Sequence, residues 1–127
     1  MATFSILVTS APFDSQGSNS ALQFIRAAIE SGHSISGVFF YQSAVTNVSA
    51  WQSPPADELQ LHQEWLALHQ AGVPLHVCAT AAARRGILGA DEAQARNLSG
   101  TNLQEQVLAS GLGQLMVLLN SDRLVQF

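Results

Sequence analysis

The chain has 127 residues, of which 47% are apolar and only 11% charged, and its formal net charge is −4. This length accommodates one domain with one hydrophobic core, so we expect a single domain over residues 1–127. Tight nucleic-acid binders neutralise phosphates with a basic patch, and an acidic chain without lysine argues against direct, stable nucleic-acid binding. Because so few charges are available for a surface that faces water, we expect partner subunits to cover part of it. The alternative is a monomer whose surface is rich in serine and glutamine.

The cysteine content and the first residues bear on the compartment. One cysteine cannot form an internal disulfide, which fits a reducing environment. The opening MATFSILVTSAPF has no basic segment before its short apolar run, and no apolar run reaches the roughly 20 residues of a membrane helix. We therefore expect a cytoplasmic protein.

The first half of the chain has the pattern of alternating strands and helices. Residues 4–10 and 35–41 are short runs rich in Ile, Leu, Val and Phe, typical of buried strands. Between them, residues 11–20 have loop and capping chemistry, and residues 21–29 repeat apolar side chains at helical spacing. A strand, a helix and a second strand in this order predict a parallel pair. A polar loop over residues 42–55 and a helix over residues 59–70, capped by Asp57, follow.

The second half continues the alternation with less certain boundaries. We expect a buried strand at Leu75–Cys78, a helix over 79–85 and a helical turn over 91–96. Residues 102–110 form either a helix or a loop that leads into a short strand at 106–109. A helix over 111–120 and a strand over 123–127 follow. The whole pattern predicts an α/β fold with a mostly parallel sheet.

Cys78 lies where the predicted strand Leu75–Cys78 turns into a helix built from alanines. In open α/β folds, chemistry concentrates at the carboxyl ends of strands, where the next helix presents free N–H groups and the positive end of its dipole. A thiol in such a place tends to ionise more readily than a free one, and the thiolate is the nucleophile. The position thus favours a sulfur nucleophile, although a lone cysteine in an apolar strand is also a common small core residue. The chain has no second cysteine for a dithiol cycle. The mechanism left open is a thiolate that carries a group and passes it to a thiol of a partner protein.

Three polar residues near Cys78 are candidates for assisting it. His76 would share the strand face of Cys78, but its ring must reach the sulfur to accept a proton, and residues two apart on a strand seldom point at each other. Arg84 and Arg85 fall in the last turn of the predicted helix, where cations complement the helix C-terminus without any substrate role.

Metal and nucleotide chemistry has little support in this sequence. His62 and His69 lie seven residues apart on one predicted helix, with no third ligand in view, so we predict no metal site. The loop over residues 10–20 has a single glycine and lacks both phosphate-binding glycine motifs, so we predict no cofactor. Because it also follows a parallel strand, this loop could still stand near Cys78.

The segment PLHVCATAAARRG (residues 74–86) resembles the active-cysteine segment of the DsrE/TusD family of sulfurtransferase subunits. The similarity runs through nearly the whole chain, in order, in FSILVTSAPFDSQGSNSALQF, HSISGVFFYQSAV, SPPADE, ASGLGQL and SDRLVQF. It implies a DsrE-like fold: a mostly parallel sheet of about five strands with helices on both faces.

The resemblance also implies a function. Cys78 matches the cysteine that accepts persulfide sulfur from a TusA-like donor and relays it to a TusE-like acceptor, for 2-thiouridine at the wobble position of transfer RNA. It further implies a heterohexamer with TusB-like and TusC-like subunits. Two alternatives remain open: a DsrE-type subunit of a DsrEFH-like complex in sulfur oxidation, and a scaffold subunit in which Cys78 is only core packing.

Overall fold

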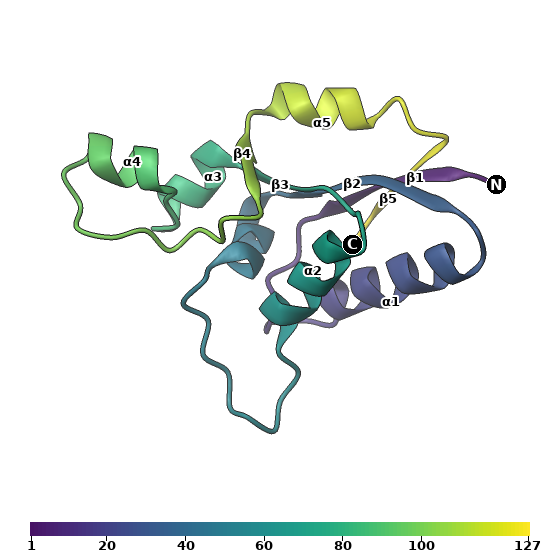
Figure 1. The fold of residues 1–127 in the computed structure, drawn as a ribbon, viewed down its shortest axis with the longest axis horizontal. Coiled ribbons are helices and arrows are strands. Elements are labelled where there is room, and N and C mark those ends of the chain that lie inside the picture. Colours follow the sequence, from purple (N-terminus) through teal and green to yellow (C-terminus); the bar gives the residue numbers. More distant parts are fainter.

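A five-stranded parallel sheet in the order β4-β3-β2-β1-β5 organises the chain in a computed structural model that describes residues 1–127 (Figure 1). Every neighbouring pair of strands is parallel. The strands are β1 (Thr3–Val8), β2 (Ser34–Phe40), β3 (Leu75–Cys78), β4 (Leu108–Ser110) and β5 (Arg123–Gln126). The predicted α/β class with a parallel sheet is confirmed, and so is the number of strands.

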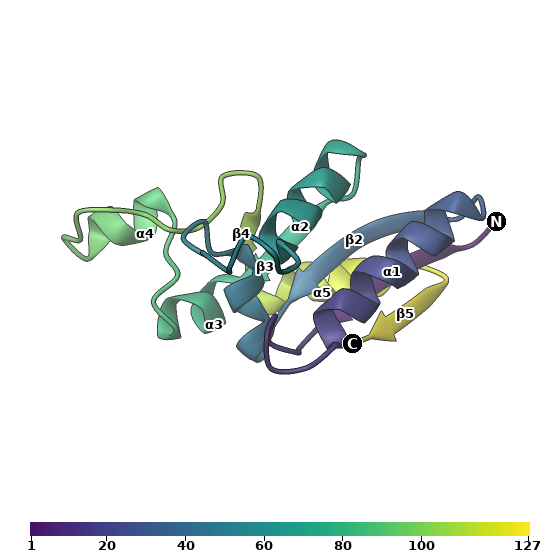
Figure 2. The ribbon, with the colours of Figure 1, turned by 90° about the horizontal axis from the view of Figure 1, so that it is seen from below.

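Helices cover both faces of the sheet, as predicted. Helices α1 (Gly17–Glu30) and α2 (Leu61–Gln70) lie on one face, and α5 (Leu112–Leu118) lies on the other (Figures 1 and 2). The short helices α3 (Ala79–Arg84) and α4 (Ala90–Ala95) extend beyond the carboxyl ends of the strands (Figure 1). This arrangement leaves the β3–α3 junction at the edge of the sheet where chemistry is expected. No helix is long and apolar enough to span a bilayer.

Alternation along β2 sends successive side chains to the two helical layers. Phe40 packs edge-on against Trp65 of α2, with ring centroids 4.8 Å apart and both side chains fully buried. Gly37 lies three positions before Phe40 and therefore faces the opposite layer. A Cβ added at Gly37 would lie 2.9 Å from Leu118 Cδ2 of α5 and 3.5 Å from His76 Cδ2. Gly37 and His76 therefore belong to the α5 face of the sheet.

The polar loop predicted over residues 42–55 is partly helical, which corrects that prediction. Residues Gln42–Val48 form a 3₁₀ helix, η1, in which Asn47 is fully buried and its side-chain amide is hydrogen-bonded. Its Nδ2 donates to Ala44 O at 2.9 Å and to Ser18 Oγ at 3.1 Å, and its Oδ1 accepts from Trp65 Nε1 at 3.0 Å. Asn47 thus ties η1 to α1 and α2, a role that local polarity does not reveal.

Helix boundaries differ from the predicted ones where capping was inferred. Helix α1 begins at Gly17, because Ser18 is buried and donates to Ser10 O at 3.0 Å instead of belonging to a loop. Helix α2 begins at Leu61, and its N-cap residue is Gln60, so the predicted cap at Asp57 is wrong. The uncertain region 102–110 contains a strand, β4, which begins two residues later and ends one residue later than the predicted 106–109. Strand β3 has the predicted bounds.

Candidate active site

Cys78 is the last residue of β3 and the N-cap residue of α3, with φ −65° and ψ 112°. It is a free thiol and only 5% exposed. The extended backbone at Cys78 ends the strand and lets α3 start at the next residue, where Ala79 has high helix propensity. No side chain caps the N-terminus of α3. The first N–H groups of this helix are therefore not taken by a side chain and are directed towards the region around the sulfur.

Ser110 is the neighbour of Cys78 across the sheet. In the parallel pair β3–β4, Cys78 and Ser110 are Cα partners, as are His76 and Leu108. His76 Nδ1 lies 3.4 Å from Ser110 Oγ, and this is the hydrogen bond of the imidazole ring. The structure therefore places His76 against Ser110, with Ser110 beside Cys78 on the same face of the sheet.

Burial lowers the pKa of His76 below its ordinary value of 6.5, because desolvation penalises the charged ring. The ring is consequently neutral at physiological pH and adds no positive charge next to Cys78. It can still orient the Ser110 hydroxyl, since a neutral imidazole nitrogen donates or accepts one hydrogen bond according to its tautomer. Sequence reasoning missed Ser110, for which the only local signal is its place in the ASGLGQL segment.

The two arginines at the C-terminal end of α3, Arg84 in its last turn and Arg85 as its C-cap residue, have different surroundings. Arg85 Nη1 donates to Ala81 O at 3.1 Å, which is the interaction expected of a cation at a helix C-terminus. Arg84 is exposed and lines a cavity of about 290 Å³ between α3 and α4. The other lining residues are Ala79, Thr80, Ala83, Glu92 and Arg96. This cavity reaches the first turn of α3, directly after Cys78.

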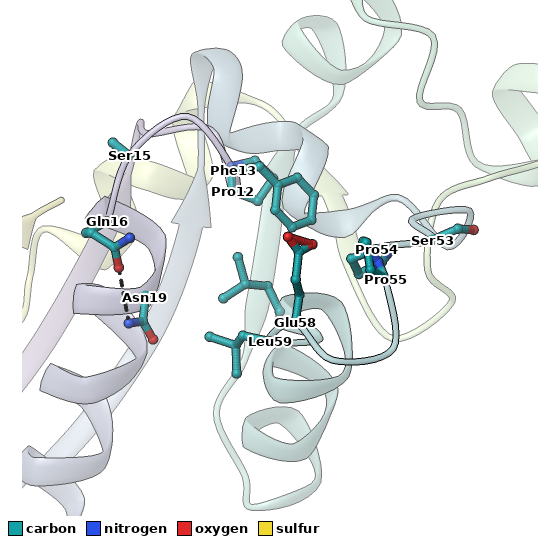
Figure 3. Close-up of a pocket in the computed structure, with 11 residues that line it drawn as sticks. Pro12, Phe13, Ser15, Gln16, Asn19, Ser53, Pro54, Pro55, Glu58 and Leu59 are labelled. Atoms are coloured by element: carbon teal, nitrogen blue, oxygen red, sulfur yellow. Dashed lines mark hydrogen bonds between the residues drawn. The ribbon is translucent and has the colours of Figure 1, made fainter.

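A larger cavity, of about 640 Å³, lies elsewhere and does not include Cys78 (Figure 3). It is formed by the loop after β1 and by the segment that leads into α2. In Figure 3 the ring of Phe13 and the carboxylate of Glu58 point towards each other across it, with Pro54 and Pro55 at its side. Glu58 is its only ionisable lining residue, and no nucleophilic thiol faces it. The position of this cavity therefore does not coincide with the position of the only thiol.

The loop after β1 stands at the same edge of the sheet as the cysteine junction, as predicted. Residues of this loop, including Phe13, line a cavity of about 530 Å³ together with Arg85 and Ile87, which follow α3. His62 and His69 lie on α2, and no group of three His, Cys, Asp or Glu side chains that could hold a metal ion occurs in the structure.

The structure is therefore a parallel α/β domain with its one thiol, nearly buried, at the end of an interior strand of the sheet. The chain belongs to the DsrE/DsrF-like family, whose sequence model matches residues 2–127. The resemblance inferred from the cysteine segment is thereby confirmed.

Named relatives match the chain from end to end. "Sulfurtransferase TusD" of Enterobacter sp. (strain 638) is 44% identical over 126 residues, which cover 98% of each chain. "Sulfurtransferase TusD homolog" of Vibrio parahaemolyticus serotype O3:K6 is 42% identical over 127 residues, which cover 98% of this chain and 97% of the relative. These relatives assign the chain to the sulfurtransferases, as the sequence predicted.

A solved structure supports the fold alone. The YchN protein from E. coli superimposes with a TM-score of 0.75 over 100% of both chains, at 22% sequence identity. At this identity the match shows that the arrangement of strands and helices is shared, and it carries no statement about activity.

Proposed function

We propose that this chain is a sulfur-relay subunit in which Cys78 holds a persulfide sulfur between a donor protein and an acceptor protein. The observation that carries the proposal is the position of Cys78, the only cysteine, at the carboxyl end of β3 and the start of α3. The named sulfurtransferase relatives, similar over the whole chain, support the same class of reaction.

The chemistry needs one thiolate and no oxidant. The Cys78 thiolate attacks the terminal sulfur of a donor persulfide, so that a new S–S bond forms at Cys78 and the donor leaves as a thiolate. The product is a persulfide on Cys78. A thiolate of the acceptor then attacks the outer sulfur, and Cys78 leaves as a thiolate. Each step breaks one S–S bond and forms another, so the oxidation level of the transferred sulfur does not change.

The finer pathway is part of the proposal. We take the donor to be TusA-like and the acceptor TusE-like, and we take the sulfur to end in 2-thiouridine at the transfer-RNA wobble position. The net charge of −4 and the absence of lysine support transfer to proteins instead of direct contact with RNA. A DsrEFH-like role in sulfur oxidation would use the same step at Cys78 with different partners.

The proposal includes assembly with TusB-like and TusC-like subunits in a heterohexamer. The outer side of α5 supports association, because Leu112, Met116 and Val117 are 48%, 64% and 58% exposed. Leu108 of β4 and Leu124 of β5 add exposed apolar surface at the two edges of the sheet. Such surface is costly in contact with water and is commonly covered in an assembly. Co-expression with candidate partner subunits, followed by light scattering of the purified complex, tests this part.

The test of the relay is the intact mass of the assembled protein before and after exposure to a persulfide donor. We expect a gain of one sulfur atom that a reductant removes and that Cys78→Ser and Cys78→Ala both abolish. Circular dichroism of both variants checks that the fold is retained. If the sulfur appears in the variants, or if wild-type protein in a competent complex never gains it, the relay role is wrong and the scaffold role takes its place.

A further inference from the structure

The basic residues of this acidic protein are concentrated next to Cys78. Residues 79–97 contain three arginines and two acidic residues, whereas the rest of the chain contains two arginines and seven acidic residues. The segment over residues 79–97, which contains α3 and α4, therefore carries a net charge of +1 in a chain whose net charge is −4. Because of the fold, this region adjoins the carboxyl end of β3, where the sulfur lies (Figure 1).

The cavity between α3 and α4 brings two of these arginines together. Arg84 from the last turn of α3 and Arg96 after α4 line the same cavity of about 290 Å³. Thr80, in the first turn of α3, contributes to the same wall and lies two residues after Cys78. An anionic group in this cavity would meet the side chains of two arginines and would lie beside the first turn of α3, which follows Cys78.

The arginines that line the cavity can bind an incoming carboxylate. The ion pairs of the chain are Arg26–Glu64 and Arg96–Glu92, so Arg84 has no carboxylate partner of its own. Glu92 and Arg96 are spaced i, i+4, and their side chains are about half exposed, at 48% and 52%. An exposed pair of this kind contributes little stability, so an incoming carboxylate can share or displace the Glu92 carboxylate.

We propose that the cavity between α3 and α4 docks a carboxylate-bearing segment of the protein that donates sulfur to Cys78. The proposal rests on the relay function above. The donor is the partner concerned because loading is the step in which a partner must reach the nearly buried Cys78 thiol. Since Cys78 is 5% exposed, a donor needs a contact that holds its persulfide at this buried sulfur. Arg84 and Arg96, which line the cavity next to the start of α3, supply that contact and steer an acidic partner to it.

The experiment measures how fast Cys78 gains sulfur from the persulfide-loaded TusA-like donor in the assembled complex, by intact mass at several donor concentrations. Arg84→Gln removes the unpaired cation, and we expect kcat/KM for loading to fall about 3- to 10-fold at low ionic strength. Glu92→Gln removes the competing carboxylate, and we expect kcat/KM to rise about 2- to 5-fold. The wild-type rate should fall with added salt, and the Arg84→Gln rate should depend on salt less steeply.

Arg123→Gln is the matched control. Arg123 is an exposed arginine on β5, the edge strand opposite β4, and its Nη1 donates only to the carbonyl of Asp122. The change in net charge equals that of Arg84→Gln, so an effect of overall charge would appear equally in both variants. We expect loading of the Arg123→Gln complex within about twofold of wild type.

Two further measurements separate this proposal from the relay function. Alkylation by iodoacetamide, which is neutral, reports the reactivity of Cys78, and inorganic polysulfide loads the sulfur without a donor protein. If both reactions work in wild type and in Arg84→Gln while loading by the protein donor is slowed only in the latter, the docking role is supported. If the protein donor loads Arg84→Gln and Glu92→Gln at the wild-type rate, the docking role is wrong and the relay stands.

Two other results would also overturn the docking role. If polysulfide does not load wild-type Cys78 at all, the relay function fails and this proposal fails with it. If Arg84→Gln instead abolishes binding of transfer RNA to the complex and leaves protein-to-protein loading unchanged, the basic region serves an RNA and not a carboxylate segment.

Discussion

Asn47 is the residue whose replacement should loosen the support of the cysteine junction without touching it. It is fully buried in η1, and its side chain makes three hydrogen bonds, to Ala44, Ser18 and Trp65. The 3₁₀ helix packs against α3 and β3, the two elements that meet at Cys78. A loss at Asn47 is therefore expected to reach the candidate site through η1.

The expected cost of Asn47→Ala follows from which partners are left without a hydrogen bond. Trp65 is fully buried and its Nε1 donates to no other acceptor, so leaving its N–H unsatisfied costs about 1–3 kcal/mol. Ser18 keeps its bond to Ser10 O, so its loss is smaller. The space left by the amide adds a cavity term, and the total comes to about 3–4 kcal/mol. This is a large share of the roughly 5–15 kcal/mol by which domains are stable.

Urea unfolding followed by circular dichroism measures the free energy of unfolding of Asn47→Ala, Trp65→Phe and the double variant. Because Trp65→Phe removes the same N–H···O bond from the other side, we expect the double variant to cost at least about 1 kcal/mol less than the sum of the single variants. We also expect Asn47→Ala to make Cys78 react faster with iodoacetamide. A cost below about 1 kcal/mol for Asn47→Ala, or additive single costs, would refute the reasoning.

Two other changes test the α5 face of the sheet. Burial holds the pKa of His76 below 6.5, so below that pH the unfolded chain binds a proton that the folded chain does not. The free energy of unfolding should therefore fall as the pH drops below about 6.5, by at most about 1.4 kcal/mol per pH unit. His76→Asn should remove this part of the pH dependence. Equal pH slopes for the variant and wild type in urea unfolding would contradict this assignment. Gly37→Val should destabilise the protein by about 1–3 kcal/mol, because a Cβ at this position already meets Leu118 at 2.9 Å. A second change, Leu118→Ala, should recover part of that loss, and a purely additive further loss would argue against the contact.

The features that depend on neighbouring residues were determined by the sequence alone. Alternating and helical periodicity located four of the five strands and the main helices, and left β4 open between a helix and a short strand. The bounds of β3 were predicted to the residue. The place of Cys78 at a strand–helix junction followed from the same local pattern, and the segments on either side of it pointed to the family. These properties are local because backbone conformation responds mainly to side chains within a few positions.

The features that depend on distant segments were decided only by the tertiary structure. Ser110 lies 32 positions after Cys78 along the chain, yet the order β4-β3-β2-β1-β5 makes the two residues neighbours. In the same way, the approach of Arg96 to Arg84 depends on how α4 folds back on α3. The sequence around Asn47 predicts a loop, and its buried hydrogen bonds to Ser18 of α1 and Trp65 of α2 arise only from the packing of these helices. Such contacts result from the packing of whole elements, to which each residue contributes only a small part of the free energy.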